Sequence, residues 1–215
     1  MRVLVTAFEP FGGAETNITQ SILSLLPNSI ADWALEKVCL PVSFKRAPIV
    51  LREAIMTYSP DLVIMLGQCP AGENIRLERF AINMMDSSKA DNDGYIPNEE
   101  TIYADQPLAL QTPLFVKALA ISCAKTGLPV VVSNSAGLYV CNRVYYEALH
   151  LQQRAIFVHV PKNIEETIAQ RKGNRQEGGT LPREHMMVQR RRKVIYSPNS
   201  LTKILSEVLA SHICK

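Results

Sequence analysis

The chain has 215 residues, of which 47% are hydrophobic, and this content is enough to build a sizeable core within one α/β domain. Its 23 basic and 20 acidic side chains leave a formal net charge of +3, which is too balanced to indicate nucleic-acid binding or an anionic membrane surface. Most of the excess positive charge lies in residues 190–193, and such a short basic run is usually a solvated surface.

The N-terminal residues and the cysteines predict a cytoplasmic protein with reduced thiols. Residues 1–10 carry one positive charge and a very short apolar run before Glu9 and Pro10, so they do not resemble a signal peptide. No apolar stretch reaches the roughly 18 residues that a membrane span needs. The five cysteines are irregularly spaced and include no Cys-x-x-Cys pair, so neither a zinc site nor a redox motif is indicated.

Strands and helices alternate along the predicted chain. The predicted elements are, in order, a strand at 2–7, a helix at 17–26, a strand at 35–42, a helix at 46–58, a strand at 61–66, a loop or β-excursion at 86–107, a helix at 113–126, a strand at 129–133, a helix at 138–151, a strand at 155–160 and a helix at 201–213. Residues 171–193 are polar and contain glycine, so we expect a mobile segment there.

The predicted fold follows from this alternation. Several of the strands are apolar throughout, which is typical of a parallel sheet covered by helices on both faces. We therefore expect a single domain over residues 1–215, built as a three-layer α/β/α sandwich with a largely parallel, twisted sheet.

Chemically unusual residues follow the predicted strands. They are Phe8 and Phe11 after the first strand, Gln68 and Cys69 after the third, Cys141 in the helix after the fourth, and His159 at the end of the last. Ligands of open parallel sheets bind beyond the carboxyl ends of the strands. If the strands are parallel, these groups converge on one edge of the sheet.

Cys141 is the candidate nucleophile. It lies in the first turn of a predicted helix, where backbone N–H groups and the helix dipole stabilise a thiolate. The preceding residues 135–137 (Ser-Ala-Gly) allow the backbone to come close to a substrate. A free cysteine is usually a small buried hydrophobic residue, and Cys39 and Cys123, which lie in apolar runs, fit that description better. Cys69, at another strand end, is the one rival.

His159 is the candidate base, and the residue that orients it is open. A lone histidine in a strand is more often a core residue, but the strand-end position of His159 favours catalysis. Glu78 taken alone is expected at the surface, paired with a neighbouring arginine. It is a functional candidate only as the third group that orients an imidazole. Asp86, Asp91 and Asp93 are competing candidates for that role.

Five blocks of sequence, in the same order, resemble the pyroglutamyl peptidase I family, also called pyrrolidone carboxyl peptidases. The blocks are residues 6–13 (Thr-Ala-Phe-Glu-Pro-Phe-Gly-Gly), 67–68 with 78–83, 91–94, 133–142 around Cys141, and 157–161 around His159. The resemblance covers residue 3 to about residue 161. It implies a cysteine peptidase that hydrolyses the N-terminal pyroglutamyl residue of peptides through a thioester, without metal or cofactor, as a homotetramer.

The resemblance also implies roles for six residues. Cys141, His159 and Glu78 would form a catalytic triad, Phe8 and Phe11 would enclose the pyroglutamyl ring, and the backbone near Gln68 would contact the lactam. The chain departs from the family pattern at residues 70–73, which replace a Gly-Gly-Arg-like stretch, at Ser88, where an arginine is common, and at Lys162, where tyrosine is frequent.

Two alternatives remain at this stage. One is a nucleoside-processing transferase on a similar α/β fold, for which Gly12-Gly13 would be a poor phosphate site. The other is a binding module that keeps the ring pocket but does not turn substrate over, and Ser88 is the feature that favours it.

Overall fold

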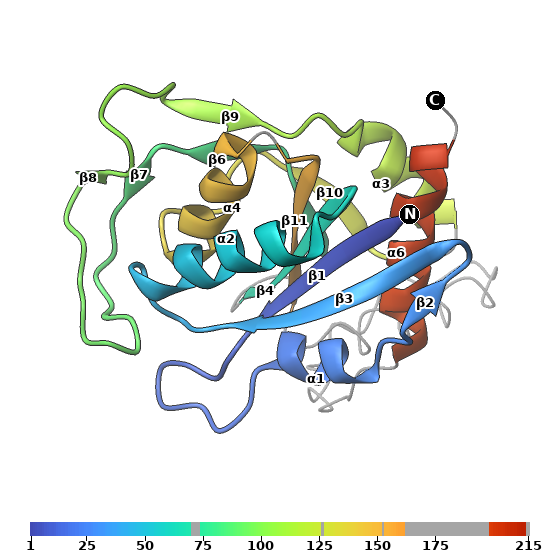
Figure 1. Ribbon diagram of the computed structural model, residues 1–215, viewed down its shortest axis with the longest axis horizontal. Helices are drawn as coiled ribbons and strands as arrows, with labels where there is room; N and C mark the ends of the chain where they lie inside the picture. Colours follow the sequence, from blue (N-terminus) through green and yellow to red (C-terminus); the bar gives the residue numbers. More distant parts are fainter. Residues whose placement is uncertain (70–73, 126, 152, 162–197, 214–215) are drawn as a thin grey trace, which may run out of the picture.

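A mixed sheet forms the centre of the computed structural model, which describes residues 1–69, 74–125, 127–151, 153–161 and 198–213. Within these ranges the sheet order is β10-β5-β11-β4-β1-β3-β2 (Figure 1). The strands are β1 (Arg2–Phe8), β2 (Ser29–Ile30), β3 (Trp33–Leu40), β4 (Leu62–Cys69), β5 (Ile75–Glu78), β10 (Val130–Ser133) and β11 (Ala155–Pro161).

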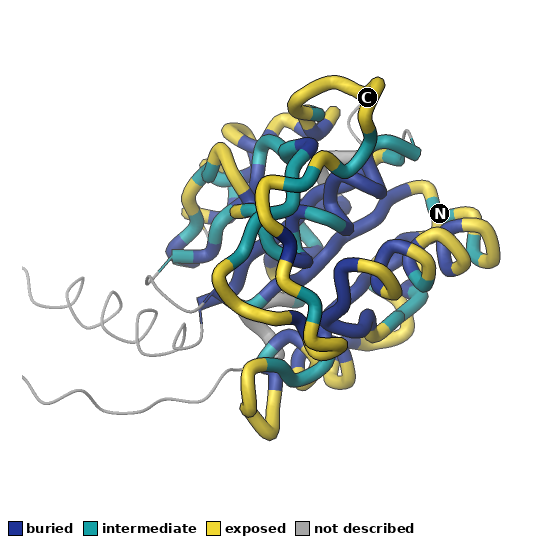
Figure 2. The backbone as a smooth tube through the Cα atoms, turned by 90° about the vertical axis from the view of Figure 1, so that its left-hand side faces the viewer, coloured by how far each residue is buried: buried dark blue, intermediate teal, exposed yellow. Residues whose placement is uncertain are grey.

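Helices cover both faces of this sheet. Helices α1 (Ile18–Leu25), α3 (Val116–Lys125) and α6 (Pro198–Ile213) contribute to the core on one face, and α2 (Arg46–Tyr58) and α4 (Val140–His150) to the core on the other. Figure 2 shows that the buried parts of the chain lie in the interior and that the exposed parts lie mostly at the periphery. The three-layer α/β/α prediction is thus confirmed.

The central strands supply both cores because their side chains alternate between the two faces. Along β1, Val3, Val5 and Ala7 join the core under α1, whereas Leu4 and Phe8 join the core under α4. A strand buried on both faces is mostly apolar, which explains the near-continuous apolar runs of β1, β4 and β11.

The direction of two strands differs from the expectation. Strands β1, β3, β4 and β11 are parallel, but β5 runs antiparallel to β11, and β10 is parallel to β5. The carboxyl end of β10 therefore points away from the edge that carries His159, so the assumption that all strand ends converge was wrong for β10. Strand β5 was not predicted, because Arg76 and Glu78 interrupt its short apolar pattern.

The loop or β-excursion predicted at 86–107 is the middle of a longer excursion that runs from β5 to α3. It contains β6 (Phe80–Ile82), β7 (Met84–Met85), β8 (Glu100–Thr101) and β9 (Ala109–Gln111), with β6 paired to β9 and β7 paired to β8. In Figure 1 this green segment extends past α4 and away from the sheet.

A buried carboxylate fastens the excursion to the helical layer. Glu147 on α4 is fully buried and accepts hydrogen bonds from Arg52 at 2.6 Å, Arg143 at 2.7 Å and Tyr103 at 2.6 Å. Burial raises the pKa of Glu147, but these donors outweigh burial and lower it below its ordinary value. The carboxylate therefore stays charged and ties α2, α4 and the excursion together.

Most predicted elements agree with the observed ones to within a few residues. The helix at 46–58 matches α2 at both ends, and the predicted strand at 155–160 matches β11 to one residue. The predicted polar segment 171–193 and the basic run 190–193 lie outside the described residues. Among the helices that the structure describes, none is both long and apolar enough to cross a membrane.

Candidate active site

His159 and Glu78 meet in the middle of the sheet. Glu78 lies opposite Phe157 in the antiparallel pairing of β5 with β11, and His159 follows Phe157 by two residues on the same face. The carboxylate of Glu78 is therefore a diagonal neighbour of the imidazole, and Oε1 lies 2.8 Å from Nδ1 of His159. Glu78 is fully buried and His159 is 8% exposed.

Cys141 approaches the same imidazole from the helical layer. It is the second residue of α4, and its half-buried, unoxidised thiol lies at the start of the helix. Burial lowers the pKa of His159, but a hydrogen bond with the Cys141 side chain, the hydrogen bond with Glu78 and the charges of both raise it above its ordinary value. The interactions with Cys141 and Glu78 thus favour the imidazolium form of His159.

The three competing aspartates have other partners. Asp91 is buried and accepts hydrogen bonds from backbone N–H groups of Phe44, Asp93 and Tyr95. Asp93 forms an ion pair with Arg46 at 2.6 Å. Asp86 accepts a hydrogen bond from the backbone of Glu99 at 3.4 Å. The aspartates shape the excursion, and among the four carboxylates Glu78 is the one bonded to His159.

Gly67 leaves room for the base. It pairs with His159 across the sheet, and a Cβ atom added at Gly67 would lie 2.6 Å from the ring of Phe157 and 3.1 Å from Cδ2 of His159. A larger residue at position 67 would therefore displace the rings of Phe157 and His159. The glycine appears in the sequence only as part of a family block, and the close approach becomes visible in the tertiary structure.

The two phenylalanines expected to hold a substrate ring have different environments. Phe8 ends β1, is 3% exposed, and its ring centroid lies 6.5 Å from that of Phe157. Phe11 is half-buried in the following loop, with its ring centroid 6.4 Å from that of Tyr139. Phe8 is thus a core residue beside the base, and Phe11 is the one whose ring is accessible.

Tyr139 is a residue that the sequence analysis missed. It is the N-cap of α4, two residues before Cys141, and its ring packs against Phe44 with centroids 5.2 Å apart as well as against Phe11. Its hydroxyl donates to the carbonyl of Ala90 at 2.9 Å. The signal available in the sequence was an aromatic residue two positions before the candidate nucleophile.

Gln68 turns its side chain away from the candidate triad. Its Oε1 accepts a hydrogen bond from the backbone N–H of Ile18 at 3.2 Å, at the start of α1 on the opposite face of the sheet. The side chain therefore holds the N-terminus of α1. Only the backbone of Gln68, which lies beside that of Val160, remains for the substrate contact that the resemblance implies.

The position where the family commonly has arginine lies at the surface. Ser88 and Lys89 are both exposed, and the local turn is closed by Ser87, whose hydroxyl accepts a hydrogen bond from the N–H of Lys89 at 3.0 Å. Neither residue is held in one orientation by the core. A positioning role for a cation at this point is therefore not built into the described structure.

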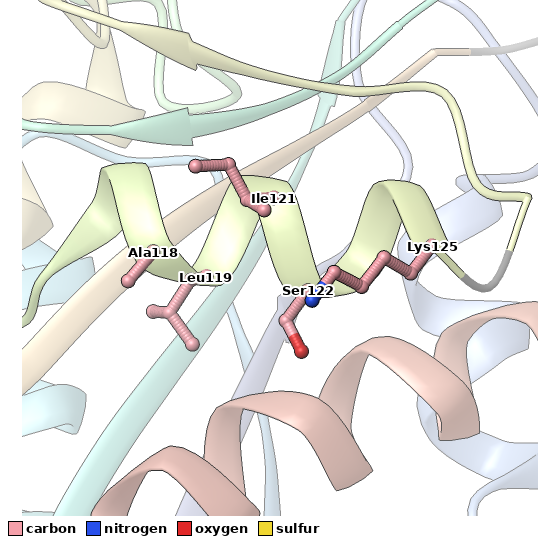
Figure 3. Close-up of a pocket in the computed structure, with 5 residues that line it drawn as sticks. All are labelled: Ala118, Leu119, Ile121, Ser122 and Lys125. Carbon is pink, nitrogen blue, oxygen red and sulfur yellow. The ribbon is translucent and has the colours of Figure 1, made fainter.

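No other described group competes with this arrangement. A hollow on α3, shown in Figure 3, is lined by Ala118, Leu119, Ile121, Ser122 and Lys125. It belongs to the face opposite the candidate triad and holds no nucleophile–base pair. Within the described ranges, no group of three or more His, Cys, Asp or Glu side chains is arranged to hold a metal ion.

A thiol at a helix start, an imidazole and a buried carboxylate on an α/β/α sheet are the elements of a cysteine hydrolase. The family model described as pyroglutamyl peptidase matches residues 1–187. The chain belongs to the pyroglutamyl peptidase family, whose members are cysteine peptidases that remove N-terminal pyroglutamate. This membership excludes the nucleoside-processing transferase.

Similar proteins carry the corresponding name. The pyrrolidone-carboxylate peptidase of Thermococcus onnurineus is 42% identical over 167 residues, covering 75% of this chain and 84% of that protein. The one from Levilactobacillus brevis is 38% identical over 179 residues, covering 80% and 87%. The solved pyrrolidone carboxyl peptidase of Thermococcus litoralis superimposes with a TM-score of 0.81 at 31% identity, covering 99% of this chain and 93% of that one.

The pKa of His159 provides a test of Glu78. The substitution Glu78→Gln keeps the shape of the side chain but removes the negative charge that stabilises the imidazolium, so the pKa of His159 should fall. Deprotonation of His159 would then occur at lower pH. We expect the alkaline limb of the kcat/KM profile to move to lower pH, together with a lower maximum.

Glu147→Gln is the matched control, because it neutralises another fully buried carboxylate that contacts no candidate catalytic residue. It should lower the melting temperature and leave the alkaline limb in place. A Glu78→Gln profile that superimposes on that of the wild type would reduce the triad to a dyad.

Proposed function

We propose that Cys141, His159 and Glu78 act as nucleophile, base and orienting carboxylate in the removal of N-terminal pyroglutamate from peptides. The observation that carries this proposal is the imidazole of His159, which is bonded to Glu78 at 2.8 Å and whose pKa is raised by interaction with the Cys141 side chain as well as with Glu78. The proposal treats residues 1–215 as one peptidase domain.

The chemistry follows from that arrangement. The Cys141 thiolate attacks the pyroglutamyl carbonyl, and backbone N–H groups at the start of α4 stabilise the oxyanion. As the tetrahedral intermediate collapses, the C–N bond breaks and the imidazolium of His159 gives its proton to the leaving amine. The neutral imidazole then takes a proton from water, which hydrolyses the thioester and releases pyroglutamate and the thiolate. Glu78 keeps Nδ1 of His159 in place throughout.

Substrate selection rests on the neutrality of pyroglutamate. The residue has a flat lactam ring and no free ammonium group, so it suits an aromatic slot lined by backbone polar groups. Phe11 and Tyr139, which pack together beside the start of α4, provide such a wall. An uncyclised N-terminal glutamate would have to bury an ammonium and a carboxylate without partners, which is costly.

Substitution of the thiols tests the nucleophile. Cys141→Ser should abolish hydrolysis of a pyroglutamyl fluorogenic amide, because a serine hydroxyl lacks the low pKa that lets a thiol ionise beside an imidazole. Cys69→Ser is the control, since Cys69 is buried at the end of β4 and should be dispensable. Iodoacetamide should inactivate the wild type. If purified protein binds the amide without releasing the fluorophore, the chain is a binding module.

The environments of Phe8 and Phe11 predict different outcomes for two otherwise equal substitutions. Phe8→Ala removes a buried ring and should cost about 3–5 kcal/mol of unfolding free energy. Phe11→Ala should leave the melting temperature nearly unchanged and lower kcat/KM for pyroglutamyl amides by about 1–3 kcal/mol. Comparable wild-type rates on pyroglutamyl and glutamyl amides would overturn the proposed specificity itself.

We also propose a homotetramer in the cytoplasm. Large apolar side chains are exposed at Leu108 (86%), Phe115 (65%) and Ile121 (60%), which supports burial against further copies of the chain. The described cysteines are free thiols, as a thiol-dependent enzyme in a reducing compartment requires. Light scattering at micromolar concentration should give about four times the chain mass of 23.9 kDa, and a monomer would contradict this.

A further inference from the structure

Two buried polar side chains on the inner face of α4 form hydrogen bonds with the backbone of the segment that begins with Glu78. They are Asn142, directly after Cys141, and Tyr145, one helical turn beyond Cys141. Both residues are fully buried. Polar groups are costly to bury unless they are hydrogen-bonded, so their partners indicate why they are there.

Asn142 binds the backbone of the β6–β7 segment as a neighbouring strand would. Its Oδ1 accepts a hydrogen bond from the N–H of Ile82 at 2.8 Å, and its Nδ2 donates to the carbonyls of Ile82 at 2.8 Å and Met84 at 2.9 Å. Both donors and one acceptor site of the amide are thus used on one segment. A shift of that segment by one residue would break all three bonds.

Tyr145 binds Glu78 itself. Its hydroxyl donates to the backbone carbonyl of Glu78 at 2.9 Å, and its ring packs against Phe157 with centroids 5.8 Å apart. Glu78 is therefore held at two points, by His159 through its carboxylate and by Tyr145 through its carbonyl. The bond from Tyr145 connects α4, which carries the thiol, to β5, which carries the carboxylate.

We propose that Asn142 and Tyr145 are positioning residues that set Cys141 in register with the His159–Glu78 pair. The inference rests on the catalytic roles proposed above. Pairing of β5 with β11 aligns Glu78 with His159, but a helix makes no ladder bonds with a sheet. The side chains of Asn142 and Tyr145 supply directional bonds in their place. Since a displacement of about 1 Å can cost on the order of a hundredfold in rate, such directional bonds have a kinetic consequence.

Tyr145→Phe tests the inference, with Tyr146→Phe as its matched control. Tyr146 is the next residue on α4, is also fully buried, and donates its hydroxyl to a carbonyl at 2.7 Å, but that carbonyl belongs to Pro107 in the excursion. Both substitutions remove one hydroxyl from a buried tyrosine of α4 and leave one backbone carbonyl without that donor, although Glu78 is buried and Pro107 is exposed. A purely structural role would therefore give the two variants the same kinetic behaviour.

The measurements are kcat and KM on a pyroglutamyl amide, and the rate of Cys141 alkylation by iodoacetamide. Tyr145→Phe should lower kcat by about tenfold or more while KM changes little. The ratio of alkylation rates at about pH 6.5 and about pH 9.5 should also fall, because a thiol generally has less thiolate character at low pH once it is moved away from an imidazolium. Tyr146→Phe should leave both quantities at the wild-type value.

Asn142→Asp provides a second, independent variant. The aspartate keeps the size of the side chain but loses both donors to Ile82 and Met84, so the alkylation ratio should fall as well. Asn83→Asp is its control, since Asn83 makes the same three kinds of bond to Tyr103 and Gln106. The control should retain the wild-type ratio.

The outcomes separate the two proposals. Equal losses of kcat and unchanged alkylation ratios in Tyr145→Phe and Tyr146→Phe would overturn the positioning role while leaving the proposed function intact. Failure of the wild type to hydrolyse the amide would overturn the proposed function. In that case a fall of the alkylation ratio in Tyr145→Phe and Asn142→Asp would still support the positioning role.

Discussion

The buried hydrogen bond between His159 and Glu78 is the interaction on which the rest of the site depends. A fully buried carboxylate is unfavourable unless a donor or a positive charge compensates it, and His159 provides both at 2.8 Å. Since none of the described residues donates a hydrogen bond to Oε2 of Glu78, compensation from the described part of the chain falls on that single contact. The interactions with Glu78 and Cys141 together raise the pKa of His159 and favour its protonated form.

The mixed sheet makes this hydrogen bond possible. Antiparallel pairing places Glu78 opposite Phe157, so the carboxylate on the last residue of β5 reaches the imidazole two residues further along β11. The same pairing requires a small residue on the other side of β11, and β4 places Gly67 there. The position of His159 thus depends on the carboxylate of Glu78 from β5 on one side and on the space left by Gly67 of β4 on the other.

The excursion and the layer formed by α2 and α4 hold the other side of the candidate site in place. Glu147 fastens the excursion to α4 and α2, while Asp91 binds three backbone N–H groups, one of them from Phe44. Phe44 packs against Tyr139, and Tyr139 packs against Phe11. A continuous aromatic contact therefore joins the loop after β1 to the first turn of α4, where an apolar substrate ring would lie beside the thiol.

The sequence by itself determined the layers and most of the chemistry. Apolar strands alternating with helices specify a covered sheet, because only burial on both faces accommodates such strands, and the family blocks specify the residues of the candidate site. Tertiary structure decided what local pattern does not encode. It set the direction of β5 and β10, and it placed Glu78 and not one of three aspartates beside His159. It also gave Phe8 and Phe11 different environments and turned the side chain of Gln68 away from the candidate triad. Each of these features depends on which element lies alongside. Periodicity reports how a residue faces its own strand or helix, and it carries no information about the partner that covers it.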